Sequence, residues 1–487
     1  MQLGSRLPIT ESLAYDDVLL LPQYSAISSR KRVSTRTHLA RNLELEVPII
    51  SSNMDTVTGS KQSIAMAQVG GIGFLHRFLP IDDEAAAVAR VKRKRAHIIW
   101  DPYTISPDKT VSAARSDMRE YEVGGLIVTE SEQDPRVVGI VTVRDIEGEN
   151  DDELVSAVMT PRNQMTTGDV DVSVPEARRL MHSARVEKLP LLDADDHCPG
   201  IIVMKDIKRL EDFPQSSIDS QGRYIVGASV GVVGDYLERA QELVLAGADC
   251  LVVDVAHAHS SHAIAGIREL HRQFADTPIV AGTVATAEGV RDLAKAGADS
   301  IRVGVGGGSA CDTRQVAGAG HLMFTSVSEC AEEGYKCGVQ VIADGGIRKP
   351  ADLSKAIGAG AHSAMLGSML AGTDEAPGQI VERDGRKLKV YRGMASMGAF
   401  ISKQIAEGGD VDDAAAEYTP EGVESVIPLV GPTAGVVKGL VGGLRSGMSY
   451  TGAETITEFH RKARFNRITS AGREESSTHI LMRGERA

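Results

Sequence analysis

The sequence predicts an α/β protein in which eight parallel strands and their helices form a (β/α)8 barrel, and a smaller domain interrupts that barrel. Three observations predict this fold: a repeated helix–turn–strand unit, eight short apolar segments, and a change of sequence pattern between about residues 100 and 214. A length of 487 residues exceeds what one hydrophobic core usually supports, which also indicates two domains.

The repeated unit consists of an amphipathic helical pattern, a glycine turn and a strand that is apolar on both faces. Its three turns are Ala246-Gly247-Ala248-Asp249, Ala296-Gly297-Ala298-Asp299 and Ala359-Gly360-Ala361-His362. Strands that are buried on both faces and alternate with helices form parallel sheets. Eight segments fit this pattern, at residues 48–50, 71–74, 224–226, 250–253, 278–280, 301–303, 339–343 and 364–366. Such a barrel, the TIM barrel, carries its active site at the carboxyl ends of its strands.

The interrupting domain contains two similar halves. The first spans residues 107–146 and the second residues 172–207, and each reads as helix, strand, strand, helix. Two such copies predict a pair related by a pseudo-twofold axis. The expected division is therefore barrel residues 1–99, an inserted module at 100–214, and the rest of the barrel at 215–487.

The composition excludes several classes of protein. The formal net charge of −13 opposes non-specific binding to nucleic acid, and an aromatic content of 4% leaves little for stacking on bases. Five cysteines are few and odd in number, which indicates a reducing compartment. The sequence shows no secretory signal and no stretch long enough to span a bilayer. These features predict a cytoplasmic enzyme without a membrane or nucleic-acid partner.

The candidate nucleophile lies in the loop GVGGGSACDTR, which follows the strand-like run at residues 300–303. Four glycines in this loop let backbone amides and carbonyls approach a ligand closely. A cysteine among free amides gains thiolate character, and the thiolate is the form that attacks an electrophilic carbon. Cys311 is therefore the expected nucleophile, and the alternative is a small buried cysteine beside a flexible loop.

Six motifs make the chain resemble the IMP dehydrogenase and GMP reductase family over nearly its whole length, because they occur in the family's order. They are Ser51-Ser52-Asn53-Met54-Asp55-Thr56, Asp254-Val255-Ala256-His257, the Cys311 loop, Asp344-Gly345-Gly346-Ile347, Met365-Leu366-Gly367-Ser368 and Tyr391-Arg392-Gly393-Met394. The resemblance implies a TIM barrel, a purine nucleotide substrate, a nicotinamide cofactor and a homotetramer that can pair into an octamer.

The resemblance assigns the substrate contacts to loops at the barrel rim. Amides and hydroxyls there suit a 5′-phosphate without a cationic cluster. Asp344 would accept hydrogen bonds from the ribose hydroxyls. Met54 and Met394 would pack on the purine, although such methionines are more often ordinary core. The implied substrate residues are Asn53, Met54, Ser309, Asp344, Gly345, Gly346, Gly367, Ser368, Tyr391, Arg392, Gly393 and Met394.

The cofactor residues implied by the resemblance are Asp254, Val255, Ala256, Gly304, Val305 and Gly306. The cofactor expected is NADPH, with NAD as the alternative. The His257-Ala258-His259 spacing also suits zinc, but the family uses this loop for the nicotinamide cofactor. Ala258 replaces the usual glycine there.

A monovalent cation such as potassium is the other expected cofactor. The carbonyls of Gly306, Gly308 and Cys311 resemble the family's cation site, which shapes the cysteine loop. The family usually has proline at Gly307 and threonine at Asp312, so this loop departs from the pattern at two positions.

The inserted module resembles a tandem cystathionine-β-synthase (CBS, or Bateman) module, whose cleft commonly holds adenine or guanine nucleotides. Thr142 and Asp145 match the threonine and aspartate that contact ribose and phosphate, whereas the second copy has Val203 with Asp206. The resemblance implies regulation by ATP or GTP at Thr142, Asp145 and Asp206. The alternative is a module that only shapes the oligomer.

The resemblance also implies a mobile flap at about residues 400–428, and this flap separates the two family reactions. A dehydrogenase hydrolyses its covalent intermediate with an arginine–tyrosine pair on the flap, but residues 400–428 contain no arginine. Thr313 and Glu421 match the threonine–glutamate dyad that can pass a proton to departing ammonia. Other features favour a dehydrogenase: the inserted module, Arg348 and the run Tyr391–Gly393 look more like the dehydrogenases of the family.

The expected activity is therefore that of a GMP reductase in purine salvage, with Cys311, Thr313 and Glu421 as catalytic residues. IMP dehydrogenase remains the alternative enzyme. A third reading, from another class, is a regulatory paralogue that binds purine nucleotides and catalyses nothing.

Overall fold

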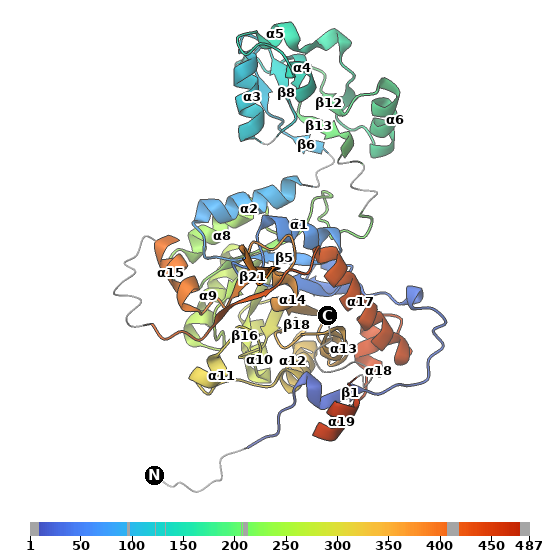
Figure 1. Cartoon of the computed structure of the whole chain (residues 1–487), viewed down its shortest axis with the longest axis vertical. Helices are drawn as coiled ribbons and strands as arrows, with labels where there is room; N and C mark the ends of the chain where they lie inside the picture. Colours follow the sequence, from blue (N-terminus) through green and yellow to red (C-terminus); the bar gives the residue numbers. More distant parts are fainter. Residues whose placement is uncertain are drawn as a thin grey trace. The chain divides into compact units, whose positions relative to one another are not determined.

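The computed structural model describes residues 9–94, 98–121, 123–131, 133–205, 207, 213–406 and 418–477. They divide into two compact units, coloured along the sequence in Figure 1. The barrel unit comprises residues 1–94, 215–220 and 224–487, and the inserted unit comprises residues 95–214 and 221–223.

Eight parallel strands of the barrel unit close into one barrel in the order β14-β15-β16-β17-β18-β19-β4-β5. All eight predicted apolar segments lie in or beside these strands, so the (β/α)8 prediction is confirmed. The strands are β4 (Ile49–Ser51), β5 (Ile72–Leu75), β14 (Val226–Val230), β15 (Cys250–Asp254), β16 (Ile279–Val284), β17 (Ser300–Val303), β18 (Gln340–Asp344) and β19 (Ser363–Leu366).

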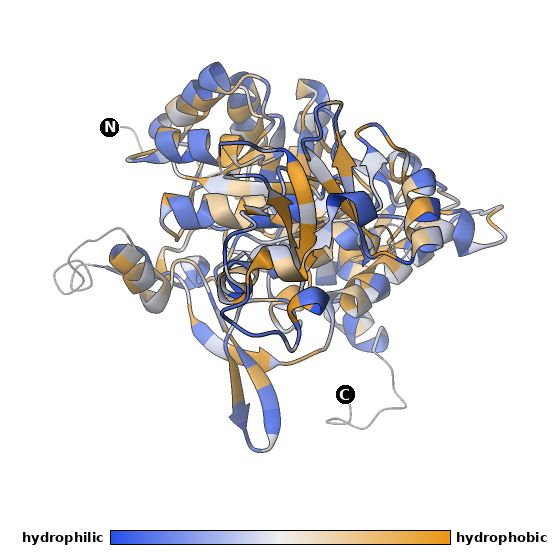
Figure 2. Ribbon diagram, turned by 90° about the horizontal axis from the view of Figure 1, so that it is seen from above, coloured by the Kyte–Doolittle hydropathy of each residue, from blue (hydrophilic) through white to orange (hydrophobic). Residues whose placement is uncertain are grey.

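Helices alternate with these strands along the chain, and all of them except the short α11 bury residues against the rest of the unit. Figure 2 shows hydrophobic and hydrophilic residues interspersed along the helices. These helices are α1 (Ser60–Gln68), α2 (Ile81–Arg93), α8 (Tyr236–Leu245), α9 (Ser261–Gln273), α10 (Ala287–Lys295), α11 (Thr313–Val316), α12 (Met323–Cys337), α13 (Pro350–Gly358), α14 (Ser368–Ala371), α17 (Thr433–Tyr450) and α18 (Ile456–Lys462). Among the described helices, none is both long and apolar enough to cross a membrane.

The last residue of each repeated turn ties the barrel together. Asp249 accepts a hydrogen bond from the backbone N–H of Val226 at 2.8 Å, and Asp299 accepts one from Ile279 at 2.8 Å. In the third copy His362 takes the same role, because its Nδ1 accepts from the N–H of Val341 at 3.3 Å. Burial lowers the pKa of His362 to about 4, with His460 and His38 adding to the effect, so the ring stays neutral and Nδ1 stays an acceptor.

A hairpin closes the amino-terminal end of the barrel. Strands β2 (Thr37–Ala40) and β3 (Leu43–Leu45) pair antiparallel, and Leu39 and Leu45 pack with the side chains that fill the barrel interior. The hydroxyl of Ser300, the first residue of β17, donates to the carbonyl of Leu39. The hairpin therefore closes this end, and the carboxyl ends of the strands are the end left for a site.

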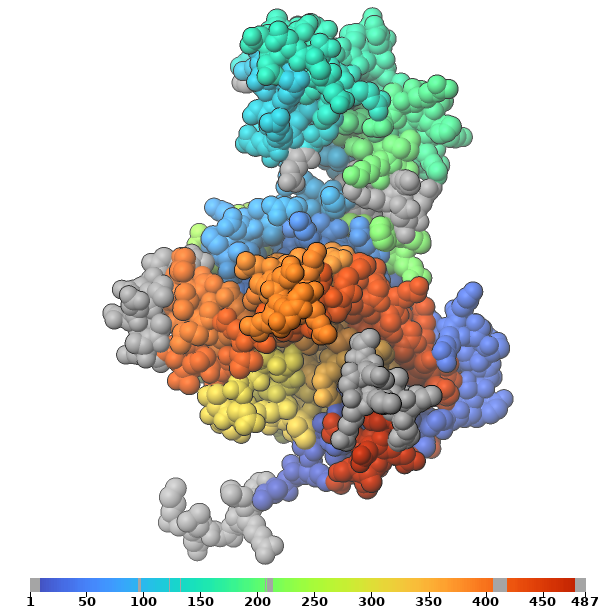
Figure 3. Space-filling model, viewed as in Figure 1, coloured from blue at the N-terminus to red at the C-terminus, as the bar shows by residue number. Residues whose placement is uncertain are grey.

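The two ends of the chain lie side by side on the barrel unit. Strand β1 (Val18–Leu20), after the 3-10 turn η1 (Tyr15–Asp17), pairs antiparallel with β23 (Phe465–Arg467). Helix α19 (Ser470–Glu475) follows β23, and the red carboxyl-terminal surface adjoins the blue amino-terminal one in Figure 3.

The remaining elements of the barrel unit form the base of the flap. Strands β20 (Ile380–Arg383), β21 (Arg386–Arg392) and β22 (Glu424–Pro428) make an antiparallel sheet. Helix α15 (Met397–Ala406) leaves from this sheet and its start is capped by Glu424, whose Oε1 accepts from the N–H of Gly398 at 2.7 Å. The short turn η2 (Arg30–Arg32) completes the unit.

The inserted unit consists of two four-stranded sheets, in the orders β10-β9-β8-β7 and β11-β12-β13-β6. Its elements are β6 (Ile98–Trp100), β7 (Thr104–Ile105), α3 (Val111–Glu120), β8 (Gly125–Thr129), β9 (Val137–Thr142), α4 (Val143–Ile146), α5 (Val155–Val158), β10 (Thr160–Pro161), η3 (Arg162–Gln164), β11 (Gly168–Asp169), α6 (Val174–Ala184), β12 (Lys188–Leu192) and β13 (Gly200–Val203). Ile127 and Val137 of one sheet pack with Leu192 and Ile201 of the other.

Candidate active site

Two adjoining cavities open at the carboxyl ends of the barrel strands. The smaller measures about 440 Å³ and the larger about 1270 Å³. A ligand with a compact end and an extended end fits such a pair of cavities. The residues that line both are Ser52, Met54, Gly307, Gly308, Asp344 and Tyr391.

Cys311 lies in the loop between β17 and α11 and is exposed to the larger cavity. Its Sγ lies 3.3 Å from Oγ1 of Thr313. The loop starts at Gly304, where φ is +154°, and a Cβ at this position would lie 1.9 Å from the carbonyl oxygen of Asp344. Only glycine therefore lets the cysteine loop lie this close to the end of β18.

The segment that returns from the flap is hydrogen-bonded to the cysteine loop. The N–H of Asp312 donates to the carbonyl of Glu421 at 2.7 Å, and the N–H of Val423 donates to the carbonyl of Ala310 at 3.0 Å. Cys311 and Gly422 form an antiparallel bridge. As a result, Cys311, Thr313 and Glu421 line one cavity although more than a hundred residues separate the first two from the third.

Arg302 joins the two aspartates at the centre of the site. Its Nη1 donates to Asp254 at 3.1 Å and its Nη2 donates to Asp344 at 2.9 Å. Arg302 is 5% exposed. Burial by itself would raise the pKa of Asp254, but Arg302, Arg77 and a hydrogen bond from Asn53 outweigh it and hold that pKa below its usual value. Arg302 thus orients both carboxylates as acceptors and helps to keep Asp254 charged.

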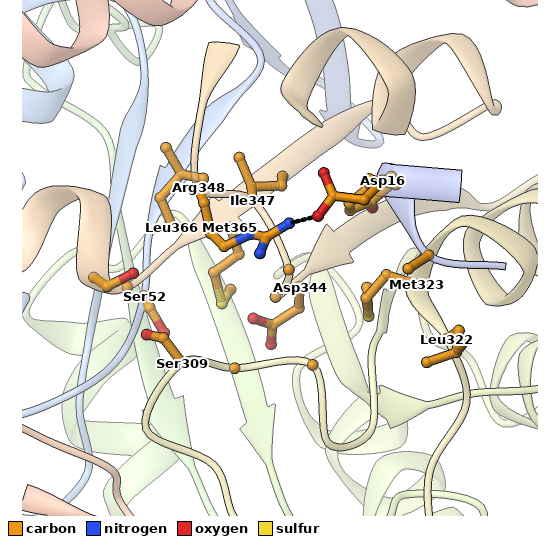
Figure 4. Close-up of a pocket in the computed structure, with 18 of the residues that line it drawn as sticks. Asp16, Ser52, Ser309, Leu322, Met323, Asp344, Ile347, Arg348, Met365 and Leu366 are labelled. Atoms are coloured by element: carbon orange, nitrogen blue, oxygen red, sulfur yellow. Dashed lines mark hydrogen bonds and ion pairs between the residues drawn. The ribbon is translucent and has the colours of Figure 1, made fainter. Parts of the chain in front are cut away.

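The smaller cavity contains most of the predicted substrate residues (Figure 4). Ser309 and Tyr391 share a hydrogen bond of 3.2 Å between their hydroxyls, and burial raises the pKa of Tyr391, so its hydroxyl stays protonated. A Cβ at Gly367 would lie 3.1 Å from that same hydroxyl. The predicted residues that line this cavity are Met54, Ser309, Asp344, Gly345, Gly346, Gly367, Ser368 and Tyr391.

The larger cavity contains the rest of the predicted set except one residue. Asn53, Gly393 and Met394 line it together with the predicted cofactor residues Asp254, Val255, Ala256, Gly304, Val305 and Gly306. The exception is Arg392, which lines neither cavity. Its Nε donates to Asp55 at 2.8 Å and its Nη2 to Ser402 at 2.9 Å, so Arg392 fastens helix α15 to the loop after β4.

The histidines that follow Asp254 do not converge. His259 pairs with Asp292 at 3.0 Å. Over the described ranges, the grouping whose ligand atoms lie close enough for a metal ion is Asp193, Asp195 and His197, in an exposed turn of the inserted unit. The described structure thus gives no support to zinc at His257 and His259.

The carbonyls predicted to bind a monovalent cation belong to Gly306, Gly308 and Cys311. The carbonyl of Gly308 accepts the N–H of Cys311 at 3.2 Å. The side chain of Arg314 lies against Gly306, where a Cβ would meet its Cγ at 2.5 Å, and its Nη2 donates to the carbonyl of Val305 at 3.4 Å. The guanidinium of Arg314 thus lies beside this part of the loop, and no chemical step below depends on a cation.

The predicted regulatory residues lie at the end of β9 in the inserted unit. The hydroxyl and the backbone N–H of Thr142 both donate to Oδ2 of Asp145, each at 2.7 Å. Lys188 of the second half is close to this pair, and burial lowers the pKa of its amine despite the opposing charges of Glu187 and Asp145. Asp206 lies outside the described residues.

Several charged residues of the site were missed by the sequence reasoning. Arg302 was read as part of an apolar strand, although a lone arginine in a barrel strand is itself a signal, because a buried charge needs partners. Asp16 and Arg473, which line the smaller cavity, carried no local signal. Arg314 and Arg348 line it too, although the first stood only at the end of the cysteine-loop motif and the second was read only as a dehydrogenase-like feature.

This fold and site define a barrel enzyme with an exposed cysteine beside cavities of nucleotide size. A family model described as the IMP dehydrogenase / GMP reductase domain matches residues 12–479. The chain belongs to this family, whose members are oxidoreductases that use nicotinamide cofactors.

The relatives carry both names. The chain is 45% identical to an inosine-5′-monophosphate dehydrogenase of Nitrosopumilus maritimus, over 97% of this chain and 99% of that protein. It is 44% identical to a GMP reductase of Leishmania major, over 98% of this chain and 99% of that protein.

Solved structures of Trypanosoma brucei GMP reductase are also similar. The complex with guanosine 5′-monophosphate has a TM-score of 0.92 and 42% identity, and covers 97% of this chain and 99% of that one. The complex with guanosine 5′-triphosphate has a TM-score of 0.81 and 38% identity, and the match covers 95% of this chain and 99% of that one.

Proposed function

We propose that this protein is a GMP reductase that converts GMP to IMP and ammonia with NADPH, as part of purine salvage. The observation that carries the proposal is the flap. Residues 400–428 contain no arginine, whereas Glu421 is hydrogen-bonded through its backbone to the residue between Cys311 and Thr313. The flap thus supplies a proton donor for an amine and lacks the arginine that would activate water.

The residues of the site support the following sequence of steps. The Cys311 thiolate forms a bond to C2 of the purine, and the C2–N bond to the exocyclic amine breaks. Glu421 provides the proton that the leaving ammonia needs, through the hydroxyl of Thr313, and a covalent thioimidate remains on Cys311. Hydride addition at C2 and loss of the thiolate then give IMP, so the nucleophile is regenerated.

The larger cavity fits a nicotinamide dinucleotide. Its volume of about 1270 Å³ exceeds what the nucleotide substrate needs. Arg77 lines this cavity, where its Nε lies 3.8 Å from the carboxylate of Asp254 and its guanidinium lies over the ring of Phe78. Bound NADPH would supply the hydride. Asp254, Val255, Ala256 and the Gly304–Gly306 segment would hold it beside Cys311.

The substrate would lie in the smaller cavity, with its ribose on Asp344 and its phosphate on the residues around Ser309 and Ser368. Support comes from the relative whose structure was solved with guanosine 5′-monophosphate. The hydrogen bond from Arg302 would hold Asp344 in position for the ribose hydroxyls.

The same proposal includes regulation and assembly. Residues 100–214 would act as a tandem CBS module that binds ATP or GTP at Thr142 and Asp145, with Asp206 as the matching residue of the second copy. The relative solved with guanosine 5′-triphosphate supports a purine nucleotide ligand. The chain would work in the cytoplasm as a homotetramer or a pair of tetramers, with potassium as a candidate ion at Gly306, Gly308 and Cys311.

The deciding experiment follows the absorbance of the reduced nicotinamide in two parallel assays, GMP with NADPH and IMP with NAD. We expect much faster turnover in the first. Glu421→Gln should slow ammonia release by at least about 100-fold, because that is the usual cost of losing a general acid, while hydride exchange between cofactor and IMP persists. Thr313→Val should slow ammonia release as much as Glu421→Gln does. The double variant should be no slower than either single variant, because both residues act on the same proton.

The control for this test is Glu382→Gln, on the exposed strand β20, which should leave both rates unchanged. The alternative function, IMP dehydrogenase, is supported by the identity to the Nitrosopumilus maritimus protein. Formation of XMP from IMP and NAD, with no NADPH oxidation by GMP, would establish that alternative. Nucleotide binding without either turnover would establish the regulatory paralogue.

A further inference from the structure

The two chain ends contribute charged residues to the smaller cavity. Asp16 follows the buried Tyr15 in η1, and Arg473 lies in α19, 457 residues away. Strands β1 and β23 bring them together, and the N–H of Ile468 donates to the carbonyl of Asp17 at 2.9 Å. The amino-terminal and carboxyl-terminal segments therefore form one wall of the cavity.

Asp16 is the centre of a cationic cluster in this wall. Its carboxylate accepts hydrogen bonds from Lys349 at 2.9 Å and from Arg473 at 2.9 Å, and it also pairs with Arg348, as Figure 4 shows. Burial opposes the ionised form, but Lys349 and Arg348 outweigh it and lower the pKa of Asp16. The side chain of Asp16 is 10% exposed, whereas that of Arg473 is 60% exposed.

The cluster carries more positive than negative charge. Three cations meet at Asp16, and Asp352 is a second carboxylate nearby, fully buried and 3.9 Å from Nε of Arg348 and 4.0 Å from Nζ of Lys349. Lys355 adds a fourth cation close to both carboxylates, and Asp17 adds a third carboxylate on the cavity wall. Among the described residues, four cations against three carboxylates leave one positive charge without a counterion in the cluster. A dianionic group in the cavity would supply it.

A buried polar atom beside the same cavity also points to a ligand. The hydroxyl of Tyr15 is buried, in a residue that is 2% exposed, and it has no partner among the residues that the structure describes. Tyr15 lines the smaller cavity. Buried donors in native proteins are normally hydrogen-bonded, so this hydroxyl indicates a polar occupant.

We propose that Arg473 is a phosphate-binding residue, which the carboxyl-terminal helix brings to the nucleotide's 5′-phosphate and which Asp16 holds in place until the nucleotide binds. The inference rests on the proposed function only in placing a nucleotide phosphate in the smaller cavity. The phosphate competes with Asp16 for the exposed guanidinium.

A purely structural role for Arg473 makes a different prediction. If the Asp16–Arg473 pair only fastens the chain ends, then removal of either partner should have the same effect. If Arg473 binds phosphate, loss of the Asp16 charge frees the cations, so Asp16→Asn should tighten phosphate binding while Arg473→Ala weakens it.

The test is equilibrium titration of the full-length protein with GMP, IMP, guanosine and ribose 5-phosphate, without cofactor. Arg473→Ala should lower the affinity for GMP, IMP and ribose 5-phosphate by about tenfold, because one partly exposed charge-assisted hydrogen bond is lost. The affinity for guanosine, which has no phosphate, should stay within about twofold of the wild-type value. Arg473→Lys should recover part of the loss. The matched control is Arg467→Ala. Arg467 is an exposed arginine of the same carboxyl-terminal segment as Arg473, it pairs with Glu11, and it lines neither cavity.

Three results would overturn the inference: unchanged GMP affinity in Arg473→Ala, an equal loss for guanosine, or a loss for GMP in Asp16→Asn. A thermal melt of each variant shows whether α19 and β23 remain in place, and Arg473→Lys gives the answer if Arg473→Ala fails to fold. Because binding is measured without turnover, the outcome is independent of which reaction the enzyme catalyses.

Discussion

Arg302→Met should destabilise the barrel unit strongly at neutral pH. The substitution keeps most of the volume but removes the cation that bridges Asp254 and Asp344 at 3.1 and 2.9 Å. Breaking a buried ion pair by removing one partner costs about 3 to 5 kcal/mol, because a buried charge is left without compensation. With about 2 to 4 °C per kcal/mol for domains of 150–250 residues, the melting temperature should fall by roughly 6 to 20 °C.

The pH dependence of this loss has a definite sign. Asp254 has a folded-state pKa below its ordinary value, so its charged form contributes stability above the unfolded pKa, and this is lost as pH falls through the folded pKa. Without Arg302, burial is unopposed by that cation and the pKa of Asp254 rises. The difference between variant and wild type should therefore be largest near pH 7 and shrink below about pH 5, as the carboxylates take up protons.

The assay is thermal unfolding without ligands at pH 7 and pH 4.5. Arg467→Met is the control, because its exposed pair with Glu11 should be worth about 1 kcal/mol or less. Arg302→Lys keeps the charge without the two-pronged geometry and should fall between wild type and Arg302→Met. A loss below about 1 kcal/mol at pH 7, or a loss that grows on acidification, would refute the bridging role of Arg302.

Two further predictions concern the nucleophile and the inserted unit. Cys311→Ala should abolish turnover but leave GMP affinity within about threefold, since the other cavity residues remain; residual turnover within about tenfold of wild type would exclude Cys311 as the nucleophile. Deletion of residues 100–214, with a short linker in their place, should leave a folded, active barrel whose rate no longer responds to ATP or GTP. A purine response that survives the deletion would place the effector site in the barrel unit.

The barrel was predictable because its signals are local and repeated. Each alanine–glycine–alanine turn ends a helix. At Gly297 the backbone has a φ of +103°, which residues other than glycine rarely adopt. Asp299 then bonds back to the preceding strand. A short sequence thus encodes a helix end, a turn and a strand start, and eight apolar strands were enough to predict closure.

The charged parts of the site were harder to predict because their partners are distant in sequence. Asp16 meets Arg473 across 457 residues, and Arg302 meets Asp344 across 42. No local pattern identifies which arginine faces a cavity and which faces water. Arg392 is the opposite case, because its motif predicted a substrate contact that the structure does not support. Its guanidinium is hydrogen-bonded to Asp55 and Ser402 and lines neither cavity.

The choice between the two reactions depends on few residues, and overall similarity does not decide it. The chain has nearly equal identity to a protein of each name. In the mechanism proposed above, both reactions would use the same cavities and a covalent bond to Cys311. They would differ only after that bond forms, when one reaction must activate water and the other must protonate an amine. That difference lies in the segment around Glu421 and in the absence of arginine from residues 400–428. Rates measured with Glu421 and Thr313 variants therefore carry more information about function than any further comparison of the whole chain.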